Sequence, residues 1–368
     1  MPLFPFTKAL HVTDFTPHTR RCFHSLRGMF EEAATRLSRR VLITLCSLPG
    51  VPRVGGSSTM QRRVIDSAIH LWSTGEPPFP WAVPPPATLA TLASAATYIA
   101  RAREAGVSGA LVVQPANHMY DHSYVAHALN EHPDFFKGMG LANPTLPPDE
   151  AVAALEALHA QGFVGVRFNA GNFPAGLASP VGKALYKRAG ELGMVVGVMA
   201  FKGLGPFVPA LHKLCEEFPA TKVVIDHLGF FRQPAIGGQL GDSAQNDEAS
   251  WQGLMGLAFY PQVFVKVSAH FRTSAEAPPF ADLEPRVVQL LKAYSPSRLM
   301  WGSDYPFVLP GGFPLPEGIT ETAAAMDYTQ AAKVPDRWTA PELDARARDA
   351  LMGGTCAELF GFAAPPAC

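Results

Sequence analysis

Short apolar runs rich in β-branched residues alternate along the chain with longer stretches of helical period, and this alternation limits the fold most. The predicted buried strands are Val64–His70, Ala110–Gln114, Phe136–Ala142, Val164–Phe168, Val195–Met199, Val223–His227, Val263–Ser268 and Arg298–Ser303. The predicted helices are Leu89–Ala105, Glu150–Gln161, Val181–Leu192, Phe207–Phe218 and Leu283–Tyr294. Eight strands in about 300 residues predict a single (β/α)8 TIM barrel. A doubly wound parallel sheet has the same alternation and is the structural alternative.

Charge divides the chain into two unlike parts. The whole sequence has 30 basic and 31 acidic side chains, a formal net charge of -1. Residues 1–63 hold ten basic and three acidic side chains, a net of +7, which leaves 20 and 28, a net of -8, for the other 305. A segment rich in Arg, Ser and Thr but poor in acids is typical of an organelle transit peptide. We therefore expect a transit peptide or disordered leader at 1–63 and one barrel domain at 64–368.

Composition excludes several classes of protein. A near-neutral net charge argues against binding of nucleic acid. The apolar run at 41–49 (VLITLCSLP) is too short to cross a bilayer, and no later uninterrupted run reaches about 18 residues, so we expect no membrane span. The five cysteines have no CxxC or metal-ligand spacing, which argues against a disulfide scaffold or a zinc ribbon; they are Cys22, Cys46, Cys215, Cys356 and Cys368.

Two irregular segments follow predicted strands. Residues 76–88 (EPPFPWAVPPPAT) are too rich in Pro for a helix or a central strand. Residues 231–250 (FRQPAIGGQLGDSAQNDEAS) have the composition of a loop after the sixth strand. Both are expected at the carboxyl ends of the strands, where barrels build their active sites.

Polar residues at the ends of apolar strands are the candidates for chemistry, because burying them costs free energy unless they are satisfied or used. They are Asp66 and His70, Gln114, Asn117 and His118, Arg167 and Asn169, Asp226 and His227, Lys266, Ser268 and Arg272, and Ser303 and Asp304. A single buried histidine is more often structural than catalytic, and Asp304 could merely cap a helix. Two imidazoles and a carboxylate that converge on one barrel mouth nevertheless indicate a general-base centre.

Two cationic strand-end residues have competing interpretations. Arg167 could pair with Asp226 or Asp304, or could bind a substrate carboxylate with its planar guanidinium. We expect Lys266 to extend its ammonium toward solvent in a structural role.

At these residues the chain resembles the amidohydrolase-related (amidohydrolase 2) barrels, which include 2-pyrone-4,6-dicarboxylate lactonase. The matching motifs are VIDSAIHLW, LVVQPANHMYDH, GLANP, GVRFN, VVIDHLG, FVKVSAHFR and RLMWGSDYPFV, in family order between Val64 and Val308, with the tail MGGTCAELFGF. The resemblance is strongest to an organelle-targeted branch of plants and algae, and it implies a chloroplast location, with the mitochondrion as the alternative. It also implies hydrolysis, or in some members decarboxylation, of small anionic compounds.

The chain departs from the metal-binding members of that family at two positions. Ala68 replaces the first histidine of the HxH pair on the first strand, and Val198 and Met199 stand where relatives place a histidine on the fifth. Zinc typically needs about three protein ligands. The remaining candidates, His70, His227 and Asp304, would make a weak metal site, so we expect no obligatory cofactor.

The leading hypothesis is therefore metal-independent hydrolysis of a lactone or ester-like bond in a small carboxylated substrate. Asp304 is the predicted general base, while His70 and His227 are predicted to polarise the carbonyl. The predicted substrate-binding residues are Arg167, Gln114, Asn169, Ser268 and Arg272. The alternatives are a catalytically impaired barrel that binds a ligand or partner, and a weak mononuclear metal hydrolase or decarboxylase. A homo-oligomer is compatible with the apolar composition.

Overall fold

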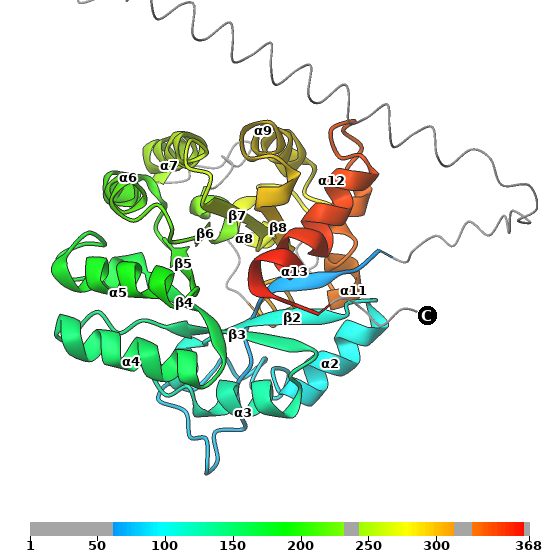
Figure 1. The fold of residues 1–368 in the computed structure, drawn as a ribbon. Coiled ribbons are helices and arrows are strands. Elements are labelled where there is room, and N and C mark those ends of the chain that lie inside the picture. Colours follow the sequence, from blue (N-terminus) through cyan, green and yellow to red (C-terminus); the bar gives the residue numbers. More distant parts are fainter. Residues whose placement is uncertain (1–61, 232–242, 313–325, 364–368) are drawn as a thin grey trace, which may run out of the picture. The chain divides into compact units, whose positions relative to one another are not determined.

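The computed structural model describes residues 62–231, 243–312 and 326–363, which form a barrel of parallel strands inside a layer of helices (Figure 1). The strands are β1 (Ile65–Ile69), β2 (Gly109–Val113), β3 (Phe136–Leu141), β4 (Phe163–Asn169), β5 (Val195–Met199), β6 (Val223–Ile225), β7 (Val263–Ser268) and β8 (Leu299–Gly302). Each strand pairs in parallel with the next one in the chain, in the order β1 to β8. This order confirms the predicted (β/α)8 barrel and excludes the doubly wound sheet, whose strand order reverses.

Helices follow the strands and cover the outside of the barrel. The longer ones are α2 (Ala95–Glu104), α3 (Ser123–Glu131), α4 (Pro148–Ala160), α5 (Pro180–Glu191), α6 (Val208–Glu217), α7 (Ser243–Leu257) and α9 (Glu284–Tyr294). The shorter ones are α8 (His270–Thr273), α11 (Tyr328–Ala331), α12 (Ala345–Asp349) and α13 (Thr355–Phe360). Among the described residues, none of these helices is long and apolar enough to cross a membrane. The predicted leader lies almost wholly outside the described residues.

The barrel closes between β8 and β1 just beyond the end of β8. The amide of Asp304 donates to the carbonyl of Ala68 at 2.8 Å, and the amide of His70 donates to the carbonyl of Tyr305 at 2.7 Å. These bonds hold the first and last strands together at the point where each of them leaves the barrel. They also bring Asp304 and His70, which are 234 positions apart, to neighbouring backbone positions.

Asp66, one of the strand-end candidates, stabilises this closure. Its carboxylate accepts hydrogen bonds from the amide of Ser303 at 2.9 Å and from the hydroxyl of Tyr328 at 2.8 Å. Burial raises the pKa of Asp66 to about 6, although these hydrogen bonds act in the opposite direction. Asp66 therefore has a structural role and faces away from the candidate site.

Two hydrophobic clusters sit on the two sides of the strands. The larger cluster fills the space between the strands and the surrounding helices. The smaller one contains residues of alternate strand positions together with residues of α13 and the segment after it: Ile65, Leu111, Val113, Met139, Val195, Val224, Met300, Cys356, Phe360 and Phe362. Phe362, just after α13, lies beside Gly109 at the start of β2, so this segment packs against the amino ends of the strands. The carboxyl ends are left to polar side chains.

The strand predictions are more accurate than the helix predictions. Helix α3 was missed because a His- and Asn-containing segment (SYVAHALNE) has a weak helical pattern. Helix α2 begins at Ala95 rather than Leu89, because the hydroxyl of Ser94 accepts a hydrogen bond from the amide of Thr97 and so caps the helix there.

The two predicted loops differ in outcome. Residues 76–88 are irregular, as their proline content predicts. The second prediction was wrong in its later half, because α7 begins at Ser243, inside the segment 231–250; residues 232–242 lie outside the described residues. The sixth strand also ends at Ile225, two residues earlier than predicted, so His227 belongs to a short turn of helix (His227–Phe230) and not to the strand.

Candidate active site

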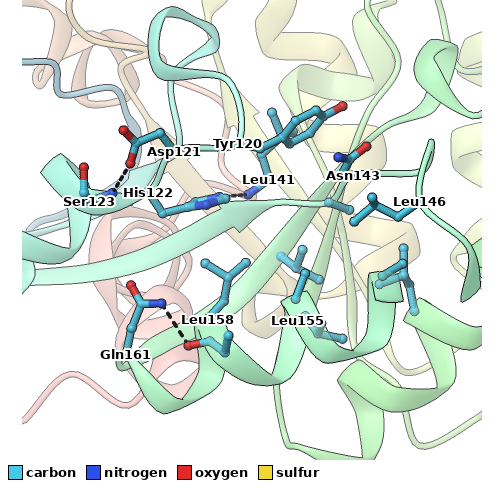
Figure 2. A pocket seen from close by; sticks show the side chains of 16 residues that line it. Tyr120, Asp121, His122, Ser123, Leu141, Asn143, Leu146, Leu155, Leu158 and Gln161 are labelled. Carbon is cyan, nitrogen blue, oxygen red and sulfur yellow. Dashed lines mark hydrogen bonds between the residues drawn. The ribbon is translucent and has the colours of Figure 1, made fainter. Parts of the chain in front are cut away.

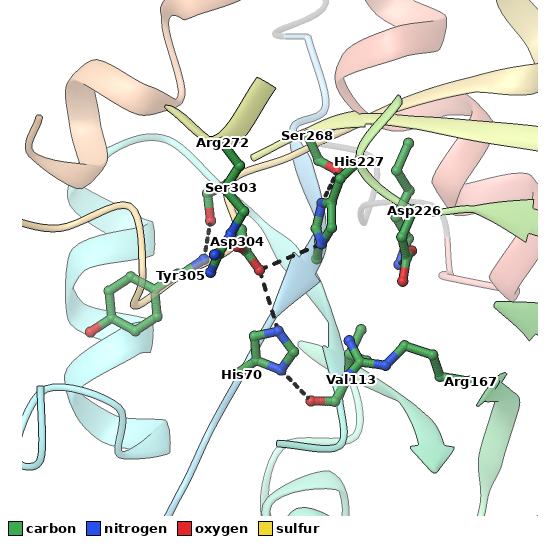
Figure 3. A network of polar contacts seen from close by, with 12 residues as sticks. His70, Val113, Arg167, Asp226, His227, Ser268, Arg272, Ser303, Asp304 and Tyr305 are labelled. Atoms are coloured by element: carbon green, nitrogen blue, oxygen red, sulfur yellow. Dashed lines mark hydrogen bonds and ion pairs between the residues drawn. The ribbon is translucent and has the colours of Figure 1, made fainter. Parts of the chain in front are cut away.

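Asp304 is the centre of a buried polar cluster at the carboxyl end of the barrel. Its Oδ1 lies 3.3 Å from His70 Nε2 and 3.8 Å from His227 Nε2, and its Oδ2 accepts a 2.7 Å bond from Arg272 Nε. Figure 3 shows the three side chains directed at this carboxylate from the segments just after β1, β6 and β7. The structure therefore brings together the predicted catalytic residues and one predicted binding residue, Arg272.

The backbone at these positions is strained. Asp304, His227 and Ala269 have φ values of 64°, 51° and 50°, in the left-handed region that residues with a Cβ rarely adopt. Such a conformation costs about 1–3 kcal/mol at each position and persists only where the surrounding structure imposes it. All three residues directly follow a strand or lie within two residues of its end, so the strain coincides with the polar cluster.

The two histidines differ in the atoms that hold them. His70 Nδ1 lies 2.9 Å from the carbonyl oxygen of Val113, which can only accept, so Nδ1 carries a hydrogen. A neutral His70 then has a bare Nε2 facing Asp304. His227 Nδ1 lies 2.8 Å from the hydroxyl of Ser268, which can donate, so a neutral His227 can carry its hydrogen on Nε2.

Electrostatics keep the carboxylate charged and the imidazoles neutral. Burial alone would raise the pKa of Asp304, but the charge of the Arg272 guanidinium holds it well below its usual range. Burial lowers the pKa of His227 to about 4, and it also lowers the pKa of His70, against the opposing effect of Asp304. At neutral pH the centre therefore combines an ionised carboxylate with two unprotonated rings.

Lys266 and Asp226 form a separate buried pair. Lys266 Nζ lies 2.9 Å from Asp226 Oδ1, and both side chains are almost completely buried. The prediction that Lys266 extends toward solvent was wrong, because its strand position points into the barrel and Asp226 neutralises it there. Asp226 also attracts Arg167 electrostatically, but no hydrogen bond joins the two in the described structure.

Arg167 is a buried guanidinium that pairs with no carboxylate within 4 Å in the described part of the chain. Its Nη2 makes a long 3.4 Å bond to the carbonyl oxygen of Gln114, and its Nε has no hydrogen-bond partner there. The side-chain oxygens Gln114 Oε1 and Asn169 Oδ1 are also buried without a partner. Burial lowers the pKa of Arg167, against the opposing effects of Asp226 and Asp304. Three predicted substrate-binding residues thus keep free hydrogen-bonding capacity.

Two other strand-end candidates support the proline-rich segment. His118 Nδ1 lies 3.1 Å from the carbonyl of Pro80, and its Nε2 accepts from the amide of Ser73 at 3.3 Å. Asn117 Nδ2 donates to the carbonyl of Val83 at 3.2 Å. Both side chains make hydrogen bonds to the backbone of residues 73–83, so neither is part of the centre around Asp304.

A cavity of about 360 Å³ lies elsewhere, among α3, α4 and the end of β3 (Figure 2). Its lining includes Leu155 and Leu158 of α4 and none of the predicted site residues. His122 in its wall accepts a 2.9 Å bond from the amide of Leu141, and burial lowers its pKa to about 4. This histidine is therefore structural, and the cavity carries no cluster of charged groups like the one around Asp304.

His270 is a buried histidine close to the centre that the sequence analysis did not single out. Its ring packs against Phe280 and Trp338, with centroids 5.8 and 5.4 Å away, and its Nε2 has no partner among the described residues. Burial lowers its pKa from 6.5 to about 3, with a smaller effect of His227. The folded protein thus binds fewer protons here than the unfolded chain between those pH values, so stability present above pH 6.5 is lost as the pH falls.

We expect His270→Phe to stabilise the protein. Phenylalanine keeps the ring packing and removes a buried polar atom that has no partner. The free energy of unfolding should therefore rise by about 1 kcal/mol at pH 7. The gain in the free energy of unfolding should be larger at pH 5. There the unfolded chain is protonated at His270 while the buried ring stays neutral, which lowers the stability of the wild type. Urea unfolding at both values measures this, with the exposed helix residue His159→Phe as control. An equal or smaller gain at pH 5 would contradict the assignment.

The comparisons with known proteins agree with this geometry. A model of the family described as Amidohydrolase matches residues 65–362, which is most of the chain and includes every residue of the Asp304 cluster. This chain belongs to the amidohydrolase family. The resemblance seen in the sequence motifs is thereby confirmed, whereas the organelle-targeted branch stays a prediction.

Named relatives include two lactone hydrolases. An L-fucono-1,5-lactonase of Burkholderia multivorans is 30% identical over 166 residues, 43% of this chain and 49% of that protein. A 4-sulfomuconolactone hydrolase of Hydrogenophaga intermedia is 26% identical over 207 residues, 55% of this chain and 61% of that protein. The matched segments therefore span roughly half of the length of these relatives.

Solved structures share the fold at lower identity. A Pseudomonas putida protein described as a candidate 2-pyrone-4,6-dicarboxylic acid hydrolase superposes with a TM-score of 0.61 at 24% identity, covering 83% of this chain and all of that one. An amidohydrolase of Burkholderia multivorans, solved with bound zinc, gives 0.59 at 20% identity, covering 81% of this chain and 99% of that one. At such identities the likeness concerns the fold.

The donor set of this chain does not fit such a metal. In the residues that the structure describes, no group of three or more His, Cys, Asp or Glu side chains is placed to hold an ion. Ala68 is buried with no ligand atom to offer, and Val198 packs into the apolar layer under the helices. The second oxygen of Asp304 binds the Arg272 guanidinium, whose positive charge would repel a cation at the same carboxylate.

Proposed function

We propose that the protein hydrolyses a lactone or related ester-like bond in a small carboxylated molecule. The observation that carries this proposal is the buried Arg167 guanidinium, which forms no ion pair within 4 Å in the described structure and lies at the same end of the barrel as Asp304 (Figure 3). Holding an unpaired charge away from water is costly, and a carboxylate of the substrate would remove that cost with charge-assisted hydrogen bonds. The choice of a lactone as the substrate rests on the names of the two curated relatives, which are both lactone hydrolases.

The geometry supports different roles for the two histidines, with Asp304 and His70 acting together as the general base. The oxygen of a water molecule attacks the lactone carbonyl carbon while its proton passes to the Asp304 and His70 pair. The low pKa of Asp304 makes it a weak base alone, but the bare Nε2 of His70, 3.3 Å away, can share the proton.

His227 has a different role from His70 in this proposal. With Ser268 donating to Nδ1, His227 carries a hydrogen on Nε2, and this N–H makes a hydrogen bond to the carbonyl oxygen as negative charge develops there. The bond between the acyl carbon and the ring oxygen then breaks, and the ring oxygen takes the proton held by the pair. The product is a hydroxy acid. The prediction that both histidines polarise the carbonyl is thus narrowed to one of them.

The proposed reaction uses no obligatory metal, and chelation tests this. We expect hydrolysis of a panel of carboxylated γ- and δ-lactones, followed by proton release, to be unchanged after extensive dialysis against a chelator. Added zinc should give no more than a twofold change. Activity that disappears on chelation and returns with zinc would overturn the metal-free mechanism. No turnover on any lactone, with a carboxylated ligand still bound, would instead support a barrel that binds without catalysis.

A further inference from the structure

Large apolar side chains are exposed mainly at the end of the barrel that holds the polar cluster. Among the described residues, the exposed fractions are 51% for Val83, 38% for Met119, 46% for Phe201 and 84% for Phe259. The first three lie in segments that follow β1, β2 and β5, at the carboxyl ends of the strands. Phe259 lies between α7 and β7, at the opposite end.

Phe201 continues an aromatic row that begins at His227. The rings of His227 and Phe230 are perpendicular, with centroids 5.1 Å apart, and Phe230 is almost completely buried. The centroid of Phe201 lies 5.3 Å from that of Phe230. Since Phe230 fills the space between them, the row runs from an imidazole of the reaction centre to a half-exposed phenyl ring.

The other side of the centre is aromatic as well. Phe307 lies edge-on to His70, with centroids 5.6 Å apart, and the Arg272 guanidinium lies 5.2 Å from the centroid of the same ring. Phenyl rings therefore flank both histidines. A substrate whose acyl carbon lies between them would contact apolar walls.

Several polar groups near these walls already make hydrogen bonds within the protein. The amide nitrogen of Gln114 donates to the carbonyls of Met119 and Asp121, at 3.2 and 2.7 Å, and that of Asn117 donates to Val83. Few polar atoms stay free there for a substrate, Gln114 Oε1 and Asn169 Oδ1 among them. Most hydroxyl groups of a hydroxyl-rich substrate would therefore lose their hydrogen bonds to water without replacement.

From these contacts we infer that the substrate is an amphipathic lactone acid, with an alkyl or aryl substituent that packs on Phe201 at the site mouth. This inference rests on the proposed hydrolysis and deepens it. Its carboxylate would bind at Arg167, its ring at Asp304, and its apolar group along the Phe230 and Phe201 row. Phe201 is then a specificity-determining residue and takes no part in the chemistry.

The test compares Phe201→Ala with wild type on two matched substrates, a γ-lactone acid with a phenyl or butyl substituent and the same acid without it. We expect wild type to prefer the substituted acid, and Phe201→Ala to raise KM for that acid about tenfold, as the loss of an apolar contact surface predicts. KM for the unsubstituted acid and kcat for both should change less than twofold. Phe259→Ala is the matched control and should change neither substrate.

Equal KM changes for the two acids, or no change for either, would overturn the inference about the substituent. That failure differs from failure of the proposed function, because the wild type would still hydrolyse both lactone acids. If wild type hydrolysed neither acid, the proposed function itself would fail. Fluorescence quenching by the substituted and unsubstituted open-chain acids gives a second readout of binding that does not depend on turnover.

Discussion

Asp304→Asn should lower kcat for lactone hydrolysis by about 10³-fold, because general-base catalysis typically contributes that much and asparagine cannot take a proton. KM should change little, since the proposed carboxylate site at Arg167 is retained. The substitution keeps the shape of the side chain, but it removes the negative charge that neutralises Arg272. Steady-state kinetics at neutral pH measures both parameters.

A control separates loss of the base from loss of the fold. Asp121→Asn removes another carboxylate, which accepts a hydrogen bond from the amide of Ser123 near the cavity of Figure 2. We expect this variant to keep kcat within twofold. A thermal melt should show both variants folded at the assay temperature. An Asp304→Asn enzyme that is folded and retains most of the wild-type kcat would contradict the assigned role.

Arg167→Met should impair binding and stabilise the free protein at the same time. Each hydrogen bond to a charged group is worth about 1.5–3 kcal/mol, so loss of the guanidinium should raise KM for a carboxylated lactone at least about 100-fold. Replacing a buried charge that forms no ion pair within 4 Å with an apolar side chain should raise the free energy of unfolding by about 1–3 kcal/mol. Kinetics and urea unfolding without ligand measure these effects.

Arg298→Met is the matched control for this prediction. Arg298 donates to backbone carbonyls of Tyr294, Tyr260 and Ala258, among others, and so has a structural role. We expect its replacement to lower stability and leave KM unchanged. The opposite signs for the two arginines distinguish a binding residue from a structural one. An Arg167→Met protein that is less stable and keeps its KM would show that Arg167 supports the fold instead.

The strands were predictable because a residue buried on both faces of a parallel sheet must be apolar, so each polar side chain at a strand end interrupts the run visibly. For that reason His70, His227 and Asp304 could be found from the sequence. Their convergence follows from the barrel, which brings all carboxyl ends to one rim. Helix α3 was not predictable in this way, since its polar residues weaken the helical period.

The pairing of charges could not be predicted from the sequence. The charged residues at and just after the strand ends could pair in several ways: Arg167, Asp226, Lys266, Arg272 and Asp304. Only side-chain geometry shows that Lys266 pairs with Asp226 and Arg272 with Asp304. The different hydrogen-bond partners of His70 and His227 have no signal in the sequence either. His270 was missed because the apolar groups that bury it, such as Trp338, come from distant segments.

The central claim is that a substrate carboxylate binds next to a lactone-hydrolysing centre, and a single comparison tests it most directly. The measurement is kcat/KM of the wild-type enzyme for a carboxylated lactone and for the same lactone with the carboxylate replaced by its uncharged primary amide. The proposed function predicts a preference of at least about 100-fold for the carboxylate, the value of a charge-assisted pair in a buried site. Equal kcat/KM for the two lactones would contradict it.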